Sequence, residues 1–414
     1  MHSVEKPQRL KINPTVANIP EALSIYMNQM VYAEKRKGID IVTMSLGEAF
    51  FDIPPFSFDN IDFVKGYHYS DSLGLPELRE KISSYYHCRY AAYSVTEKNI
   101  MISSGSKANI YMVMRLVLEP GDEVLMHEPA WLSYQEQARL AGGIPRFIPY
   151  NEGLGNISAY LTDQTKLLVL NNPNNPAGWI YKKDELKYIY TVCREKGIFL
   201  LMDEAYSDFV ENEADFTSLA SIGEDLEGIF VVNSLSKNMG MSGWRIGYVI
   251  AEQQMIMEML KLNQHIVTCA PTLLQMYLAY YFDDIIAITL PQAKAVVQKR
   301  ARMLRYIEEI GLSHLPGTAT FYIFIDVSHC NVNTLDFCLY LLFKYGVATV
   351  PGSAYGKSTN SFIRVGIGAE SEERLKRGFD IIKMVLDGNL ANEDYVNRRL
   401  EANGFYKFGD EVQC

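Results

Sequence analysis

The sequence predicts an α/β protein built on a mostly parallel sheet, followed by a smaller α+β domain. Three observations predict this. Between about residues 98 and 250, short apolar runs alternate with helix-like stretches. A long helical stretch over 285–311 separates this region from a second group of helices and strands. The chain has 414 residues, of which 48% are hydrophobic, enough for one large core and a smaller one.

The apolar runs of the first region are predicted strands, because such runs between helices are typical of parallel strands covered on both faces. Helices are predicted over 107–119 and 184–197, the second ending at Gly197. The predicted strands are 99–104, 122–128, 166–172, 197–206, 228–234 and 245–251. Sheets of this kind bind ligands at the carboxyl ends of their strands, so the residues after these runs are the candidate site.

The second region contains the segments TFYIFIDV, TLDFCLYLLFKYG, VATVPG, SFIRVGIG and SEERLKRGFDIIKMVLDG, which predict a smaller α+β domain. The first 40 residues are helical in pattern and are expected to pack with it. The polar segment after residue 388 has no functional interpretation from its sequence. The expected parts are 1–45 (N-terminal arm and part of the small domain), 46–295 (large domain), 296–388 (small domain) and 389–414 (C-terminal extension).

The composition argues against several classes of protein. The formal net charge of −10 is unfavourable for binding nucleic acid or anionic membranes, which both favour basic patches. No apolar run approaches the roughly 20 residues that span a bilayer, and the N-terminal residues lack an apolar signal core. The six cysteines are scattered without a CxxC pair, which indicates reduced thiols and neither disulfides nor a zinc site. We expect a soluble, cytoplasmic protein without a metal.

Two strand ends carry polar residues. After the first predicted strand, Ser104, Gly105, Ser106 and Lys107 open a helix, and free N–H groups at a helix N-terminus attract anions. Taken alone, this turn reads equally well as an ordinary N-cap. Asp203 and its neighbour Glu204 end another strand, where carboxylates also serve as helix caps. Neither signal identifies a site by itself.

The remaining signals concern aromatic residues and one lysine. Trp131 and Tyr134 follow a strand, where aromatic residues are more often part of the core. Lys237 lies among serines, small residues and methionines in SLSKNMGMSGWRIG, which is not the setting of a surface lysine. A phosphate-binding turn, an acid, a flat aromatic side chain and such a lysine together suit an aromatic aldehyde phosphate held as a Schiff base.

The order of seven motifs supports a family resemblance. The motifs are YHYSDSLGLPELRE, ISSGSKANI, EPAWLSY, NNPNNPAG, LLMDEAYSDF, SLSKNMGMSGWRIGY and FIRVGIG. From about residue 12 to 386, the chain resembles the fold type I pyridoxal-phosphate enzymes of the aspartate aminotransferase family, in class I/II. The resemblance implies a seven-stranded sheet in the large domain, pyridoxal 5'-phosphate as the cofactor, and a homodimer with shared active sites.

The resemblance also implies roles for individual residues. Lys237 would form the Schiff base and carry the Cα proton, and Asp203 would pair with the pyridinium nitrogen. Tyr206 and Asn175 would hydrogen-bond the ring hydroxyl, and Trp131 would stack on the ring. The residues expected to hold the phosphate are Gly105, Ser106, Lys107, Ser234 and Arg245, with Tyr69 from the second subunit. The residues expected at the substrate are Gly47, Trp131, Asn175 and Arg364, with the Arg364 guanidinium binding the α-carboxylate.

The implied reaction is transamination between an L-amino acid and a 2-oxo acid, in a ping-pong sequence through pyridoxamine phosphate. Lys107 suggests glutamate or aspartate as the donor, because it could receive a distal carboxylate. The departure GEAFF at 47–51, where many relatives read GEPDF, places Phe50 and Phe51 near the expected substrate entrance. Together with Trp131 and Tyr134, these residues favour a bulky side chain on the second substrate.

Other functions remain open at this stage. A lyase, a cyclase or another non-transaminating enzyme of the same fold would share these residues. A cofactor-binding regulator would need a DNA-binding module, for which the N-terminal 40 residues leave no space. A catalytically inactive relative would be expected to lack Lys237 or Asp203, and both are present.

Overall fold

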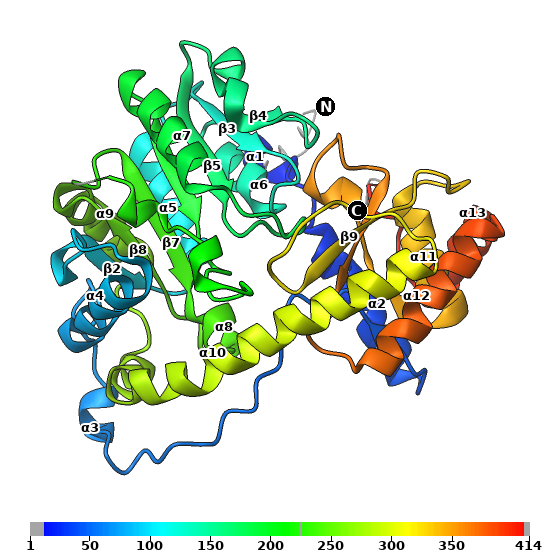
Figure 1. Cartoon of the computed structure of the whole chain (residues 1–414), viewed down its shortest axis with the longest axis horizontal. Coiled ribbons are helices and arrows are strands. Elements are labelled where there is room, and N and C mark those ends of the chain that lie inside the picture. Colours follow the sequence, from blue (N-terminus) through cyan, green and yellow to red (C-terminus); the bar gives the residue numbers. More distant parts are fainter. Residues whose placement is uncertain (1–11, 224, 410–414) are drawn as a thin grey trace, which may run out of the picture.

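A seven-stranded sheet is the centre of the larger domain in the computed structural model, which describes residues 12–223 and 225–409 (Figure 1). The strands follow the order β2-β8-β7-β6-β5-β3-β4. All pairs are parallel except those of β8, which runs antiparallel to both β2 and β7. The strands are β2 (Ile100–Ser103), β3 (Glu123–His127), β4 (Ile144–Ile148), β5 (Thr165–Asn171), β6 (Phe199–Asp203), β7 (Ile229–Ser234) and β8 (Gly247–Ala251).

The mostly parallel sheet and the six strands predicted for it are confirmed, whereas β4 was not predicted. Helices cover both faces, and side chains alternate between two cores as the period of a strand requires. In β6, for example, Leu200 and Met202 belong to one core and Leu201 to the other. The helices of this domain are α3 (Phe63–Gly66), α4 (Pro76–Tyr90), α5 (Ser106–Val117), α6 (Ser133–Leu140), α7 (Lys183–Glu195), α8 (Leu235–Asn238) and α9 (Gln253–Ile266).

A 38-residue helix, α10 (Thr272–Glu309), connects the two domains (Figure 1). It begins 13 residues before the helix predicted from residue 285, and the expected domain boundary at 295–296 falls inside it. Leu278 and Phe282 belong to a core of the large domain, and Val297 and Met303 to that of the small domain. Within the described residues, α10 is the one helix long and apolar enough to cross a membrane by length and composition. Its buried side chains pack instead into the two protein cores.

The small domain combines the two ends of the chain. Its three-stranded sheet has the order β11-β12-β9, and β1 pairs in parallel with β10. Helix α2 (Leu23–Arg36) of the N-terminal segment lies in this domain, whereas α1 (Pro14–Ala17) lies beside α6 of the large domain (Figure 1). The elements are α2 (Leu23–Arg36), β1 (Val42–Thr43), β9 (Tyr322–Asp326), α11 (Thr334–Tyr345), β10 (Val347–Ala348), β11 (Val350–Pro351), β12 (Phe362–Gly366) and α12 (Glu372–Asp387); α1 (Pro14–Ala17) precedes them.

The C-terminal extension packs on the small domain through α13 (Glu393–Ala402) and the residues after it. Arg399 Nη2 lies 3.0 Å from the buried Glu34 carboxylate of α2. The Tyr26 hydroxyl of the same helix donates to the Tyr406 carbonyl at 2.6 Å, and the Tyr406 hydroxyl donates to Glu21 at 2.6 Å. The described part of the extension therefore covers α2 and belongs to the small-domain core.

Some expectations fall outside the described residues. These are residues 1–11 of the N-terminal arm, residues 410–414 of the extension, and the thiol of Cys414. Among the residues that the structure describes, the other cysteines are free thiols; they are Cys88, Cys193, Cys269, Cys330 and Cys338.

Candidate active site

A cavity of about 460 Å³ lies at the carboxyl ends of the parallel strands and is lined by both domains. This is the position where open α/β sheets bind ligands, and the size is that of a small-molecule site. The predicted site residues that line it are Gly47, Ser106, Lys107, Trp131, Asn175, Asp203, Tyr206, Ser234, Lys237, Arg245 and Arg364. The structure therefore brings together residues that are up to 317 positions apart, from Gly47 to Arg364.

Lys237 lies in α8, a short helix that follows β7. Ser234 caps this helix, since its Oγ accepts a hydrogen bond from the Ser236 N–H at 3.1 Å. Lys237 Nζ donates to the Gly47 carbonyl across the cavity. Burial lowers the pKa of Lys237 to about 8. A lysine with this pKa is partly neutral near physiological pH, which a nucleophilic amine requires.

Four charged groups around the cavity change the pKa of Lys237, and the smallest of these effects is that of Asp203, which raises the pKa. After burial, the Glu48 carboxylate has the next largest effect and raises the pKa of Lys237. Arg364 and Arg245 lower it, because a nearby positive charge disfavours the ammonium form. The effects of burial and the arginines outweigh those of Glu48 and Asp203.

The start of α5 forms a site that fits a phosphate group. Gly105 precedes the helix at φ 80°, and a Cβ there would lie 2.7 Å from Nη2 of Arg245. A Cβ on Gly247 would lie 2.4 Å from the Ser106 nitrogen. Only glycine allows this close approach, so the Ser106 N–H and the Arg245 guanidinium stay next to each other. A helix N-terminus beside a guanidinium is an anion site.

Arg245 is held in the left-handed region at φ 55°. Its Nη1 donates to the Ser242 carbonyl at 2.9 Å and to Ser236 Oγ at 3.4 Å. Burial, and then the charge of Arg245, lower the pKa of Lys107. Lys107 Nζ lies 5.0 Å from the centre of the Trp131 ring, in a cation–π contact.

Asp203 is a buried carboxylate at the end of β6. The Tyr134 hydroxyl donates to its Oδ2 at 2.6 Å and the Ala205 N–H donates to its Oδ1 at 3.0 Å. Burial raises the pKa of Asp203, although these two hydrogen bonds and the charge of Lys237 act in the opposite direction. A protonated ring nitrogen would offset the cost of burying this charge.

A chain of hydrogen bonds runs from Tyr206 through Asn175 to Arg364. Asn175 Nδ2 donates to the Tyr206 hydroxyl at 3.1 Å, which lies 3.0 Å from the Tyr322 hydroxyl. Arg364 Nη1 donates to Asn175 Oδ1 at 3.3 Å, and its Nη2 donates to the Ser45 carbonyl at 2.9 Å. The guanidinium carbon lies 4.5 Å from the centre of the Tyr322 ring. The Arg364 guanidinium is therefore held rigidly at one side of the cavity.

Several residues that line the cavity were not predicted from the sequence, among them Ser236, Tyr322 and Ser45. Ser236 contacts Arg245 and could have been found from the repeated serines of SLSK, where only Ser234 was selected. Tyr322 and Ser45 approach Arg364 from distant segments, and nothing local in the sequence indicates this. Gly105 does not line the cavity itself but lies directly behind it, against Arg245.

Other expectations need revision. Phe50 and Phe51 do not line the cavity: Phe50 is 64% exposed, and Phe51 stacks on Phe209 at a centroid distance of 5.9 Å. The expectation that they shape the side-chain pocket is wrong for this chain, because the GEAFF segment turns away after Glu48. The expectation for Tyr69 concerns the partner's site and is not affected: Tyr69 lies outside the cavity of its own subunit, and its side chain is 86% exposed.

Comparisons with known proteins assign the family. The family model for aminotransferases of class I and II matches residues 60–382. A protein named "probable aspartate/prephenate aminotransferase" from Aquifex aeolicus is 34% identical over 387 residues, covering 85% of this chain and 93% of that protein. The chain belongs to the class I and II aminotransferases.

Solved structures support the same assignment for this aminotransferase. An aspartate aminotransferase from Thermus thermophilus, solved with maleate, is 25% identical, covers 91% of this chain and 100% of its own, and has a TM-score of 0.82. An aromatic aminotransferase from Pyrococcus horikoshii is 27% identical over 87% of this chain and 100% of its own, with a TM-score of 0.77. The fold is therefore that of the fold type I pyridoxal-phosphate enzymes.

Aminotransferases of this family depend on pyridoxal phosphate, and the cavity of this aminotransferase suits that group. The cradle of Gly105, Ser106 and Arg245 fits a phosphate. Lys237 provides an amine of lowered pKa for an aldehyde, and Asp203 provides a buried acceptor for a protonated ring nitrogen. These residues therefore fit the phosphate, the aldehyde and the ring nitrogen of the cofactor.

Proposed function

We propose that this aminotransferase takes its amino group from glutamate or aspartate and transfers it to a 2-oxo acid. The observation that carries the proposal is that two cations, Arg364 and Lys107, line the same cavity as Lys237. Arg364 suits the α-carboxylate of the donor, and Lys107 suits its distal carboxylate. The relatives named aspartate aminotransferase, and the Thermus structure with the dicarboxylate maleate, agree with this substrate class.

The proposed roles of the chain's own residues follow from the contacts of the cavity. Ser106, Ser234 and Arg245 bind the phosphate, with Gly105 leaving room for it. Asp203 accepts a hydrogen bond from the ring nitrogen, and Asn175 and Tyr206 bind the ring hydroxyl; the residue stacked on the ring is Trp131. Bound pyridoxal phosphate supplies an electron sink for the carbanion at the substrate Cα.

Lys237 is the proposed covalent attachment point of the cofactor and the group that moves the proton. Once the substrate's amino group has taken its place on the cofactor, the released Nζ, in its neutral form, would take the proton from the substrate Cα and would later return it at the cofactor's aldehyde carbon. Gly47 leaves backbone space next to this amine, since a Cβ there would lie 3.0 Å from the Tyr322 hydroxyl. Delivery of the proton to that carbon is the step that separates transamination from the other reactions of the fold.

The donor is tested by a half-reaction without any oxo acid. Addition of glutamate should abolish the visible absorption band of the lysine-bound cofactor, and one equivalent of 2-oxoglutarate should appear. Lys107→Met should raise the concentration of glutamate needed to abolish half of the band by about ten-fold or more, because a charge-assisted hydrogen bond is lost. Alanine is the control donor, because it has no distal carboxylate. The concentration of alanine that abolishes the band should therefore be the same for both proteins. A band that persists with both dicarboxylates would refute the proposed donor.

We further propose a cytoplasmic homodimer in which Tyr69 contributes to the partner's active site. The side chain of Tyr69 is 86% exposed and lies outside the cavity of its own subunit. Three nearby apolar side chains, Phe63, Val64 and Tyr67, are also exposed. Exposed apolar side chains that lie together are typical of a protein–protein interface. The free cysteines suit a reducing compartment.

The proposed role of Tyr69 predicts complementation between an impaired variant and an inactive one. Tyr69→Ala should lower activity by about ten-fold or more through the lost phosphate hydrogen bond, and Lys237→Ala should abolish it. Mixing the two proteins under conditions that exchange subunits should restore activity, because each mixed dimer contains one site with both residues. Turnover and size-exclusion chromatography would measure this. A fully active monomer, or a mixture without recovered activity, would contradict the shared site.

A further inference from the structure

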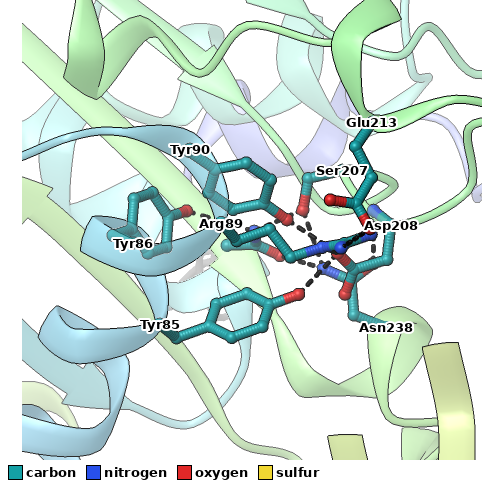
Figure 2. A network of polar contacts seen from close by, with 9 residues as sticks. Tyr85, Tyr86, Arg89, Tyr90, Ser207, Asp208, Glu213 and Asn238 are labelled. Carbon is teal, nitrogen blue, oxygen red and sulfur yellow. Dashed lines mark hydrogen bonds and ion pairs between the residues drawn. The ribbon is translucent and has the colours of Figure 1, made fainter. Parts of the chain in front are cut away.

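A buried carboxylate, Asp208, joins helix α4 to the end of β6, five residues after Asp203 (Figure 2). Its Oδ1 accepts hydrogen bonds from the Tyr85 hydroxyl at 2.6 Å, from the Tyr90 hydroxyl at 2.7 Å and from Arg89 Nε at 3.2 Å. All three donors come from the last turns of α4. A carboxylate with this many charged or hydroxyl donors is held in one orientation.

The donors around Asp208 remain in their donor forms. Burial, and then the Asp208 charge, raise the pKa of both Tyr85 and Tyr90 far above the ordinary value, so both phenols stay protonated. Burial disfavours the charge of Arg89, but the Asp208 carboxylate, the two phenols and Glu213 together outweigh it and raise the pKa of Arg89. Arg89 also pairs with Glu213 at the surface. The cluster therefore combines the Asp208–Arg89 ion pair with two neutral hydroxyl donors.

The same cluster connects to the segment that contains Lys237. The Asp208 N–H donates to Asn238 Oδ1 at 3.4 Å, and Asn238 Nδ2 donates to Ser207 Oγ at 2.9 Å. Asn233 Nδ2 donates to the same Ser207 oxygen at 3.1 Å and to the Tyr86 hydroxyl of α4 at 3.2 Å. Asn238 directly follows Lys237, while Ser207 and Asp208 directly follow Tyr206.

We propose that Asp208 is a positioning residue for Lys237. Its carboxylate fixes the segment after Tyr206 to α4, and the backbone N–H of Asp208 and the hydroxyl of Ser207 in that segment hold Asn238, the neighbour of Lys237. This inference rests on the role proposed above for Lys237. The α8 helix has only four residues and cannot be stable by itself, so tertiary contacts must fix the direction of its lysine. None of the Asp208 contacts enters the cavity, so the residue acts through its neighbours.

Positioning and proton affinity of Lys237 are coupled through burial. The amine has a pKa of about 8 chiefly because it is buried. If the Asp208 contacts are lost, α8 can move and water can reach Nζ, which raises the pKa toward the ordinary lysine value. The neutral fraction of the amine near pH 8 then falls. A defect confined to folding would not change this pKa in the molecules that remain folded.

The test compares Asp208→Asn with a matched control, Asp336→Asn. Asp336 is equally buried, accepts from Asn333 Nδ2 at 2.5 Å and pairs with Lys407 at 3.2 Å, but it lies in the small domain outside the cavity. The full-length proteins, freed of cofactor, are labelled with trace acetic anhydride across a range of pH. Mass spectrometry of the peptide that contains Lys237 then gives the pH at which the amine becomes reactive.

For Asp208→Asn, we expect the titration of Lys237 to move to higher pH, and kcat of the cofactor-loaded enzyme to fall about ten-fold with KM nearly unchanged. In Asp336→Asn, Lys237 should become reactive at the same pH as in the native protein. Equal titration curves for the native protein and Asp208→Asn would overturn the positioning role. A shift of the same size in Asp336→Asn would also overturn it.

A second, milder variant covers the case in which Asp208→Asn does not fold. Tyr90→Phe removes one hydroxyl donor and keeps the Asp208–Arg89 pair, and it should shift the Lys237 titration in the same direction by less. If this variant folds and shows no shift, the inference fails. The outcome is distinct from failure of the proposed function, which would appear as covalent cofactor binding in Lys237→Ala.

Discussion

Replacing Lys237 with alanine should leave a folded protein that no longer binds pyridoxal phosphate covalently, with turnover lower by at least about 10⁴-fold. The substitution removes both the nucleophile and the group that moves the Cα proton, and general acid–base catalysis alone contributes about 10²–10⁴-fold. Asp203 and the phosphate cradle stay intact. The cofactor should therefore still bind, but reversibly, because those contacts do not involve the lysine amine.

The measurement for Lys237→Ala is the absorption spectrum after dialysis, together with steady-state turnover. Native protein should keep its cofactor band, and the variant should lose it. Lys261→Ala is the matched control, since this lysine is exposed and pairs with Glu258 one turn away in α9. It should behave as the native protein does. A Lys237→Ala protein with a persistent band and normal turnover would disprove the assigned site.

The second large effect is expected for Arg364→Lys. The substitution should lower kcat/KM by about a hundred-fold for every amino acid and oxo acid, mostly through KM. A lysine keeps the charge, but its single ammonium cannot make the two parallel hydrogen bonds that a guanidinium makes to a carboxylate. Each charge-assisted hydrogen bond lost costs about 1.5–3 kcal/mol. Because all substrates share the α-carboxylate, the loss should be uniform across them.

The surroundings of Arg364 explain why lysine should fail there. The guanidinium carbon lies 4.5 Å and 5.3 Å from the ring centres of Tyr322 and Tyr355. Burial disfavours the charge of Arg364, but the phenols of these two residues raise its pKa, so it stays cationic. A lysine would lose both the stacking and the bonds to Asn175 and Ser45.

Kinetics with glutamate and an amino acid of unrelated side chain would test the Arg364 prediction. Arg302→Lys is the control, because its partner Glu372 lies at the surface, 2.7 Å away, and the pair does not reach the cavity. Unchanged KM values in Arg364→Lys would mean that another group binds the α-carboxylate. A loss confined to dicarboxylates would instead place the distal carboxylate at this arginine.

Much of the large domain could be predicted because its strands are buried on both faces. The runs that became β5, β6 and β7 are continuously apolar and are bounded by turn residues, so their pattern is unambiguous. By contrast, β4 is an edge strand that contains Pro145 and Arg146, and four of its five residues are partly or wholly exposed. Proline and charge are tolerated only at an edge, and a local pattern does not reveal an edge.

The sequence pattern did not predict the first 13 residues of α10 for a related reason. Its first 13 residues are rich in aromatic side chains, including Tyr277 and Tyr281, and lack a clear polar face. These residues pack against α3, α4 and the segment around Phe56, so the helix is buried unevenly along its length. A helix that crosses two domains does not show the simple amphipathic period of a surface helix.

The sequence by itself pointed to the residues that we propose to carry chemistry in this aminotransferase, because each follows a strand or opens a helix: Lys237 after β7, Asp203 at the end of β6, and Ser106 at the start of α5. Local chain geometry places such residues at one edge of the sheet. Only the tertiary structure decided which distant residues complete the site. Tyr322 and Ser45 meet Arg364, Tyr134 meets Asp203, and Phe51 turns away onto Phe209. These contacts depend on how the two domains pack, and no local pattern in the chain encodes that packing.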